Sequence, residues 1–267
     1  MKRFLWSIIF ALTATLTASA QLYNPGEVLS YRVSYKARLF PNTEVATVDV
    51  RTTLDTLDGK PHYKVHGHGI TMPAYRWFFT VDDSYYIWAD TADNRTMRFA
   101  SDIREGSYTF RSEYIYDWKR GEVHTRWQKK KLPEQRKVMK ISDRGMDPVS
   151  LDFNLRTEAS ASFNEGESRR LEMVLEDTVR YLEFRFIKRE VKRVPKMGKF
   201  NTLKFKCQIG TSDGFSFTDG TEFSIWITDD DNKFPVYLES PIRIGSICGY
   251  ISSFSGLKYP LESLVKR

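Results

Sequence analysis

Three histidines share one face of a predicted strand, a pattern that could hold a metal ion. His62, His66 and His68 have the same parity, and alternate side chains of a strand point to the same side. His66 and His68 would lie about 7 Å apart along the strand. Such a pair can bind zinc or copper, with His62 or His124 as a third ligand. No carboxylate has the spacing of a metal site, so we favour a solvated face and expect no cofactor.

Two further stretches resemble chemical motifs without matching them. Asp229–Asp231 is an acidic segment between two apolar runs, but it lacks the residue pattern of a calcium-binding loop, so we expect a solvated hairpin turn. Gly245–Gly249 differs in spacing from the G-x-S-x-G nucleophile motif. We therefore assign no catalytic residues, and an enzyme is the less favoured class.

The chain contains two cysteines, Cys207 and Cys248. Their spacing fits neither a zinc site nor a C-x-x-C redox motif, and Cys248 as a nucleophile would need a histidine partner. In an oxidising compartment an even number of cysteines permits one disulfide. We predict a disulfide between them, with two separately buried thiols as the alternative.

Aromatic residues make up 14% of the chain, and many occupy alternate positions of predicted strands. A curved sheet of this size encloses either a packed core or a cavity, and a packed core is the simpler interpretation. A cavity would make the protein a carrier or sensor of lipid-like molecules. The candidates to line it are Tyr31, Tyr35, Trp77, Phe79, Trp88 and Trp226.

The segment 118–140 is a predicted hairpin that is rich in lysine and arginine and contains Trp118 and Trp127. Such a hairpin could contact the anionic surface of an envelope membrane. The simpler interpretation is that its charges protect a sheet edge against aggregation.

Residues 1–20 have the pattern of a secretory signal peptide. Lys2 and Arg3 precede a short apolar run, and Ala18–Ala20 offers small residues for cleavage before Gln21. No later apolar run approaches the ~20 residues of a membrane-spanning helix, so we expect no transmembrane segment after cleavage. Cleavage lowers the formal charge from +7 to +5, and an exported chain seldom meets nucleic acid, so no nucleic-acid partner is expected.

The elements that must position these residues are mostly strands, because apolar and polar residues alternate along residues 21–267. The exception is 147–156, where Asp147 can cap a helix that has Pro148 at its first position. This helix joins two β-rich halves, 21–145 and 157–267, without a flexible linker. We predict a single, mainly β domain with a large curved antiparallel sheet, half-barrel or barrel-like, and one short helix.

Several stretches together resemble an exported Gram-negative family known as domain of unknown function 3108. They are Gly26–Val33, Phe79–Asp83, Asp147–Leu151 with Arg156, Ile225–Asp230 with Phe234–Val236, and Gly245–Ile247. The resemblance implies a periplasmic or secreted protein but no assigned activity. More distantly, Trp226, Asp229 and Pro235 are similar to a hairpin of the periplasmic lipoprotein carriers, which implies a half-barrel sheet around a hydrophobic cavity.

These expectations favour a non-catalytic protein of the cell envelope that binds an apolar or amphipathic molecule. An enzyme acting on envelope polysaccharide or lipid is one alternative. A protein-interaction module that uses exposed strand edges is the other.

Overall fold

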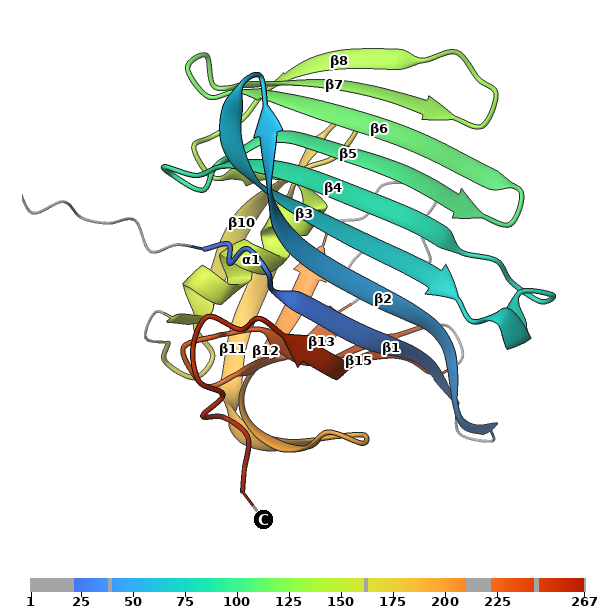
Figure 1. The fold of residues 1–267 in the computed structure, drawn as a ribbon, viewed down its shortest axis with the longest axis vertical. Coiled ribbons are helices and arrows are strands. Elements are labelled where there is room, and N and C mark those ends of the chain that lie inside the picture. The colour runs from blue at the N-terminus through green and yellow to red at the C-terminus, as the bar shows by residue number, and fades with distance from the viewer. Residues whose placement is uncertain (1–21, 38–39, 161–162, 210–221, 243–244, 267) are drawn as a thin grey trace, which may run out of the picture.

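The computed structural model describes residues 22–37, 40–160, 163–209, 222–242 and 245–266, and the predicted signal peptide lies outside them (Figure 1). The first run of strands precedes the helix α1, which spans Pro148–Ser160, and the second run follows it. The first run is β1 Val28–Ala37, β2 Phe40–Leu57, β3 Lys60–Thr71, β4 Asp82–Asp90, β5 Thr96–Glu105, β6 Tyr108–Asp117, β7 Glu122–Lys129, β8 Gln135–Lys140 and β9 Gly145–Met146. The second run is β10 Ser168–Val174, β11 Val179–Val194, β12 Gly198–Ile209, β13 Glu222–Thr228, β14 Pro235–Pro241 and β15 Ser246–Ser255.

All 15 strands belong to one sheet in the order β8-β7-β6-β5-β4-β3-β2-β1-β15-β14-β13-β12-β11-β10-β9. Every pairing is antiparallel except that of β9 with β10. The two runs of strands meet where β1 pairs with β15, so Tyr31 lies opposite Ile251. The predicted mainly β fold with one large curved antiparallel sheet and a short helix is therefore confirmed, and the sheet is open rather than closed into a barrel.

Local sequence explains how the strands begin and turn. Asp58 and Gly59 both have positive φ, +51° and +76°, as a tight turn between β2 and β3 requires. Along β3, Tyr63 and Val65 are buried, while Lys64 and His66, which alternate with them, are partly exposed. This alternation gives the sheet an inner, apolar face and an outer, polar face.

The helix begins as predicted and continues four residues beyond the predicted end. The Asp147 carboxylate accepts hydrogen bonds from the backbone N–H groups of Val149 and Ser150, each at 2.9 Å, and Pro148 occupies the first helical turn. A carboxylate at this position satisfies backbone donors that would otherwise lack partners in the helix.

The helix α1 lies between the two runs of strands (Figure 1). Phe153 packs on one side in a cluster with Tyr23, Tyr63 and Ile87, so it contacts the side formed by β3–β7. On its other side, Leu151, Leu155 and Ala159 pack in a cluster with residues of β10–β13. The sheet therefore wraps around its own helix, which is buried on both sides.

The ends of the sheet are tied to each other by side chains. Thr125 Oγ1 of β7 donates a hydrogen bond to the Glu176 carbonyl at 2.6 Å. Lys137 Nζ of β8 donates to the Asp177 carbonyl at the same distance, 2.6 Å. Glu176 and Asp177 form the turn between β10 and β11, so these bonds hold the two distant parts of the sheet in a strongly curved arrangement.

Candidate functional site

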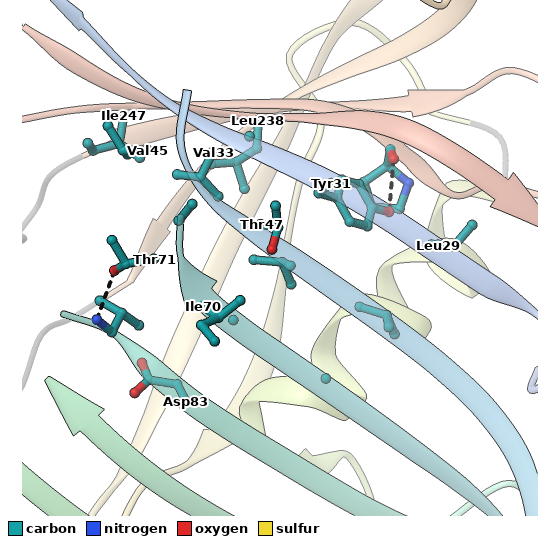
Figure 2. A pocket seen from close by; sticks show the side chains of 18 of the residues that line it. Leu29, Tyr31, Val33, Val45, Thr47, Ile70, Thr71, Asp83, Leu238 and Ile247 are labelled. Carbon is teal, nitrogen blue, oxygen red and sulfur yellow. Dashed lines mark hydrogen bonds between the residues drawn. The ribbon is translucent and has the colours of Figure 1, made fainter. Parts of the chain in front are cut away.

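The curved sheet forms a cavity of about 1,020 Å³, open to solvent, beside the first turns of α1 (Figure 2). Its walls are the inner faces of β1–β4 and of β13–β15. Packed protein interiors contain few voids larger than a water molecule, so a space of this size is not an ordinary packing defect. The apolar lining side chains include Leu29, Val33, Val45, Val48, Ile70, Phe153, Ile225, Leu238 and Ile247.

Three glycines in the strands make much of this space. Gly67 and Gly69 of β3 and Gly249 of β15 line the cavity. A Cβ atom added at Gly67 or Gly69 would come no closer than 4.0 or 3.7 Å to a neighbouring atom, and one at Gly249 would have no atom within 4 Å. None of the three has a positive φ, so backbone geometry does not require glycine here. Glycine inside a strand often marks a close approach by another molecule.

A polar cluster lies beside the cavity on α1. Arg156 is 7% exposed, and its Nη1 donates to Glu27 Oε1 at 2.8 Å. Its Nη2 lies 3.5 Å from Asp152 Oδ2. Burial opposes the charge of Arg156, but the two carboxylates raise its pKa. Glu27 and Arg156 come from two of the stretches that carry the family resemblance.

Asp152 differs from Glu27 because it reaches the cavity. It lines the cavity, and its side chain is 36% exposed. Burial raises the pKa of this carboxyl group, and the Arg156 charge partly offsets the effect. On strand β1, which also lines the cavity, the Tyr31 hydroxyl donates to the Pro235 carbonyl at 3.1 Å. Burial raises the pKa of Tyr31 well above the usual value for tyrosine.

The second carboxylate that lines the cavity is Asp83 of β4 (Figure 2). It lies opposite Gly69 in the pairing of β3 with β4. Burial raises the pKa of this carboxyl group, and the Arg104 backbone N–H, which donates to Asp83 Oδ1 at 2.9 Å, partly offsets the shift.

Aromatic side chains gather where β3 passes into β4. The short 3-10 helix Pro73–Tyr75 begins this connection, and Tyr75, Phe78 and Phe79 line the cavity. Trp77 and Phe78 are 83% and 79% exposed, which is unusual for side chains of this size. We call residues 75–79 the aromatic loop. It places apolar surface both at the cavity and in solvent.

Three of the six predicted ligand-binding residues, Tyr31, Tyr35 and Phe79, line the cavity. Trp77 belongs to the aromatic loop but is not part of the lining. Trp88 does not line the cavity either. Its Nε1 donates to Asp55 Oδ2 at 3.1 Å, and the Arg98 guanidinium stacks 5.0 Å from its ring centre.

Trp226 also lies outside the cavity lining. It is buried in a separate cluster with Phe200, Val236 and Tyr250, and its Nε1 donates to Glu190 Oε1 at 2.7 Å. Its neighbour Ile225 points to the cavity instead. The hairpin of β13 and β14 contributes Ile225, Pro235, Tyr237 and Leu238 to the cavity lining, whereas Trp226 does not belong to it.

The predicted disulfide is not formed, because Cys207 and Cys248 are both buried free thiols. Cys248 lies opposite Glu239, Glu239 opposite Ser224, and Ser224 opposite Lys206. Three strand spacings, about 14 Å, thus separate the two cysteines. A disulfide needs Cα atoms within roughly 7 Å.

The histidines of β3 each contact another group of the protein. His66 stacks on Tyr86 with ring centres 4.4 Å apart, and His68 Nε2 lies 2.9 Å from Asp82 Oδ1. His62 is buried, and its Nδ1 lies 3.0 Å from the Lys60 carbonyl. Within the described residues, no group of three or more histidine, cysteine, aspartate or glutamate side chains is arranged to hold a metal ion.

The acidic turn after β13 is solvated only in part, because Asp231 is exposed whereas Asp230 and Asn232 are buried. Asp230 Oδ2 accepts a hydrogen bond from the Ser263 backbone N–H at 3.1 Å. The Asn232 side chain bonds to the backbone of Tyr259 and to the Pro260 carbonyl. This turn therefore anchors the C-terminal segment.

Sequence reasoning missed the glycines and Asp152. The stretch from His66 to Gly69 alternates histidine with glycine, and the predicted metal candidates, the histidines, lie on the outer face of the strand. Glycine at alternate positions of a predicted strand is a usable signal for space on the other face.

A family model described as a protein of unknown function, DUF3108, matches residues 30–252. The chain belongs to this family. A search of curated proteins finds no match.

Among solved structures, the chain is similar to a β-barrel-like protein of domain of unknown function DUF1849 from Brucella abortus. The identity is 10%, the TM-score is 0.56, and the match covers 87% of this chain and 98% of that chain. A Parabacteroides distasonis protein named "putative lipoprotein" matches with 10% identity and a TM-score of 0.36, over 88% of this chain and 98% of that chain. The first likeness supports the barrel-like fold.

No helix among the described residues has both the length and the apolar character needed to cross a bilayer.

Proposed function

We propose that this DUF3108 protein is exported to the cell envelope and binds an apolar or amphipathic molecule in the cavity. The observation that carries the proposal is the cavity itself. Its volume of about 1,020 Å³ is at the upper end of the range of roughly 300–1,000 Å³ for small-molecule sites. Its lining is mainly aliphatic and aromatic, and the absence of side chains at three strand glycines leaves the space open.

Binding of the neutral fluorescent probe N-phenyl-1-naphthylamine to the purified protein without residues 1–20 tests this proposal. We expect saturable binding with a blue shift of the probe emission. Gly67→Phe should weaken it at least about tenfold, because a benzyl group would occupy the space where the probe binds. Thr53→Phe on β2 is the matched control, since Thr53 is exposed and lies outside the cavity lining. Equal binding by both variants would remove the cavity as the binding site.

Contact with an anionic membrane is the second part of the proposal, and the aromatic loop supports it. Trp77 and Phe78 are exposed beside the cavity, where aromatic side chains could enter the interfacial region of a bilayer. In the predicted basic hairpin 118–140, Lys130 and Lys131 lie between β7 and β8, and both are exposed. The meander places the β7–β8 turn and the aromatic loop at the same end of the strands (Figure 1).

Sedimentation with vesicles separates this contact from ligand binding. We expect the protein to bind vesicles with a fraction of phosphatidylglycerol more strongly than vesicles of phosphatidylcholine alone. Trp77→Ser should reduce binding to both kinds of vesicle, and Lys130→Glu with Lys131→Glu should reduce only the preference for anionic lipid. Negligible binding that salt does not change would exclude the membrane contact and leave the cavity proposal intact.

A further inference from the structure

The charged residues that line the cavity are of one sign. The chain carries 41 lysines and arginines against 34 aspartates and glutamates. Yet the described residues that line the cavity include Asp83 and Asp152 and no lysine, arginine or histidine. The charged side chains that line the cavity of this basic protein are therefore all acidic among the described residues.

Arg156, the cation that contacts Asp152, does not reverse this charge balance. Arg156 is buried against Glu27 and Asp152, at 2.8 and 3.5 Å, and it is not part of the cavity lining. The three groups together carry one net negative charge when both carboxylates are ionised. A net charge beside apolar walls is costly unless a partner compensates it.

The helix α1 offers no substitute site for an anion. Its N-terminal turns face the cavity through Val149 and Asp152. The backbone N–H groups of Val149 and Ser150 already donate to the Asp147 carboxylate, and that of Leu151 donates to the Asp147 carbonyl. Pro148 has no N–H group. Thus the positive end of the helix is occupied by an internal carboxylate.

Resting on the proposed function, we propose that the ligand is an amphiphile whose polar end donates hydrogen bonds, as a hydroxyl or ammonium group does. Its apolar part would fill the space beside Gly67, Gly69 and Gly249, and its polar end would donate to Asp152 or Asp83. Fatty acids and other amphiphiles with an anionic end are excluded, because their charge would meet two carboxylates in a cavity with mainly apolar walls.

Displacement of N-phenyl-1-naphthylamine by three matched C12 compounds, each below its micellar concentration or solubility limit at pH 7, tests this inference. We expect 1-dodecylamine and 1-dodecanol to displace the probe at concentrations at least about tenfold lower than dodecanoate. In Asp152→Asn, the preference for the amine over the carboxylate should fall by about tenfold. Asp83→Asn provides a second variant, and Asp49→Asn, on β2 and outside the cavity lining, is the matched control.

The outcomes separate the inference from the proposed function. If dodecanoate displaces the probe as well as the amine does, or better, the preference for donors is wrong although the cavity binds amphiphiles. If the preference persists unchanged in both Asp152→Asn and Asp83→Asn, these carboxylates do not cause it and the inference fails. If the probe itself does not bind, the proposed function fails first.

Discussion

The inner face of the sheet is filled on one side of the molecule and hollow on the other. On β11 and β12, Phe184, Phe186 and Phe205 pack with ring centres 5.5–6.1 Å apart. On β3, Gly67 and Gly69 occupy positions on the inner face, and the space beside them is open. Both walls have the same strand alternation, so the side-chain volume at inward positions decides whether the sheet encloses a core or a site.

The filled and the hollow side of the sheet should differ most in the free energy of unfolding that is lost when a buried side chain is shortened. Ile227→Ala, in the filled wall, should lower the free energy of unfolding by about 2–5 kcal/mol, because Ile227 is fully buried and the change creates a new void. Ile70→Ala, in the hollow wall, should cost less than about 1.5 kcal/mol, since it enlarges a space that already exists. Urea unfolding of both variants measures the difference. Equal costs would mean that the cavity is not hollow in solution.

Adding a side chain should have the opposite pattern. Cys207→Phe overfills the packed wall, where Cys207 contacts the phenylalanine cluster, and should cost about 1–3 kcal/mol or more. Gly67→Phe should change stability by less than about 1 kcal/mol, because the new ring enters open space and the unfolded chain loses freedom. Thermal unfolding without ligand compares them. A large loss in Gly67→Phe would contradict the open space.

The two faces of β4 should respond to pH with opposite signs. Burial raises the pKa of Asp83 on the cavity side, so its ionisation disfavours the folded state. The stability of Asp83→Asn relative to wild type should therefore rise as pH increases from the ordinary pKa of aspartate through the raised pKa of Asp83.

On the outer side, the hydrogen bond from His68 lowers the pKa of Asp82. The stability that this group contributes is present above the ordinary pKa of aspartate and lost as pH falls through the lowered value. Asp82→Asn is thus the control for Asp83→Asn, and stability curves against pH for both variants measure the effect. Curves with the same sign would contradict the assignment of the two faces.

The smallest expected effect concerns the cysteines. Reductant should leave the melting temperature unchanged, because Cys207 and Cys248 are free thiols. Burial raises the pKa of Cys207, so this thiol should react with an alkylating reagent only after unfolding. Mass spectrometry of the unfolded, non-reduced protein should show two labels on each chain. Unlabelled protein would restore the disulfide.

Local signals in the sequence predicted the elements well. The pair Asp58–Gly59 is of a type common in hairpin turns and forms one here, and Asp147–Pro148 predicted the start of α1. Alternation along the strands predicted the fold class, and these features depend on residues close together in the chain. Predicted export stays a prediction, because residues 1–20 lie outside the described part of the chain.

The tertiary structure alone decided which candidates share the site. Alternation places Tyr31 on one face of its strand and Trp226 on one face of another, but it does not say which face becomes concave. That choice depends on the pairing of β1 with β15, residues more than two hundred positions apart, and on the position of α1. The curvature brought Tyr31, Gly67 and Asp152 to one cavity and left Trp88 and Trp226 outside it. The reason is that curvature makes one face of the sheet concave, and local alternation does not determine which face that is.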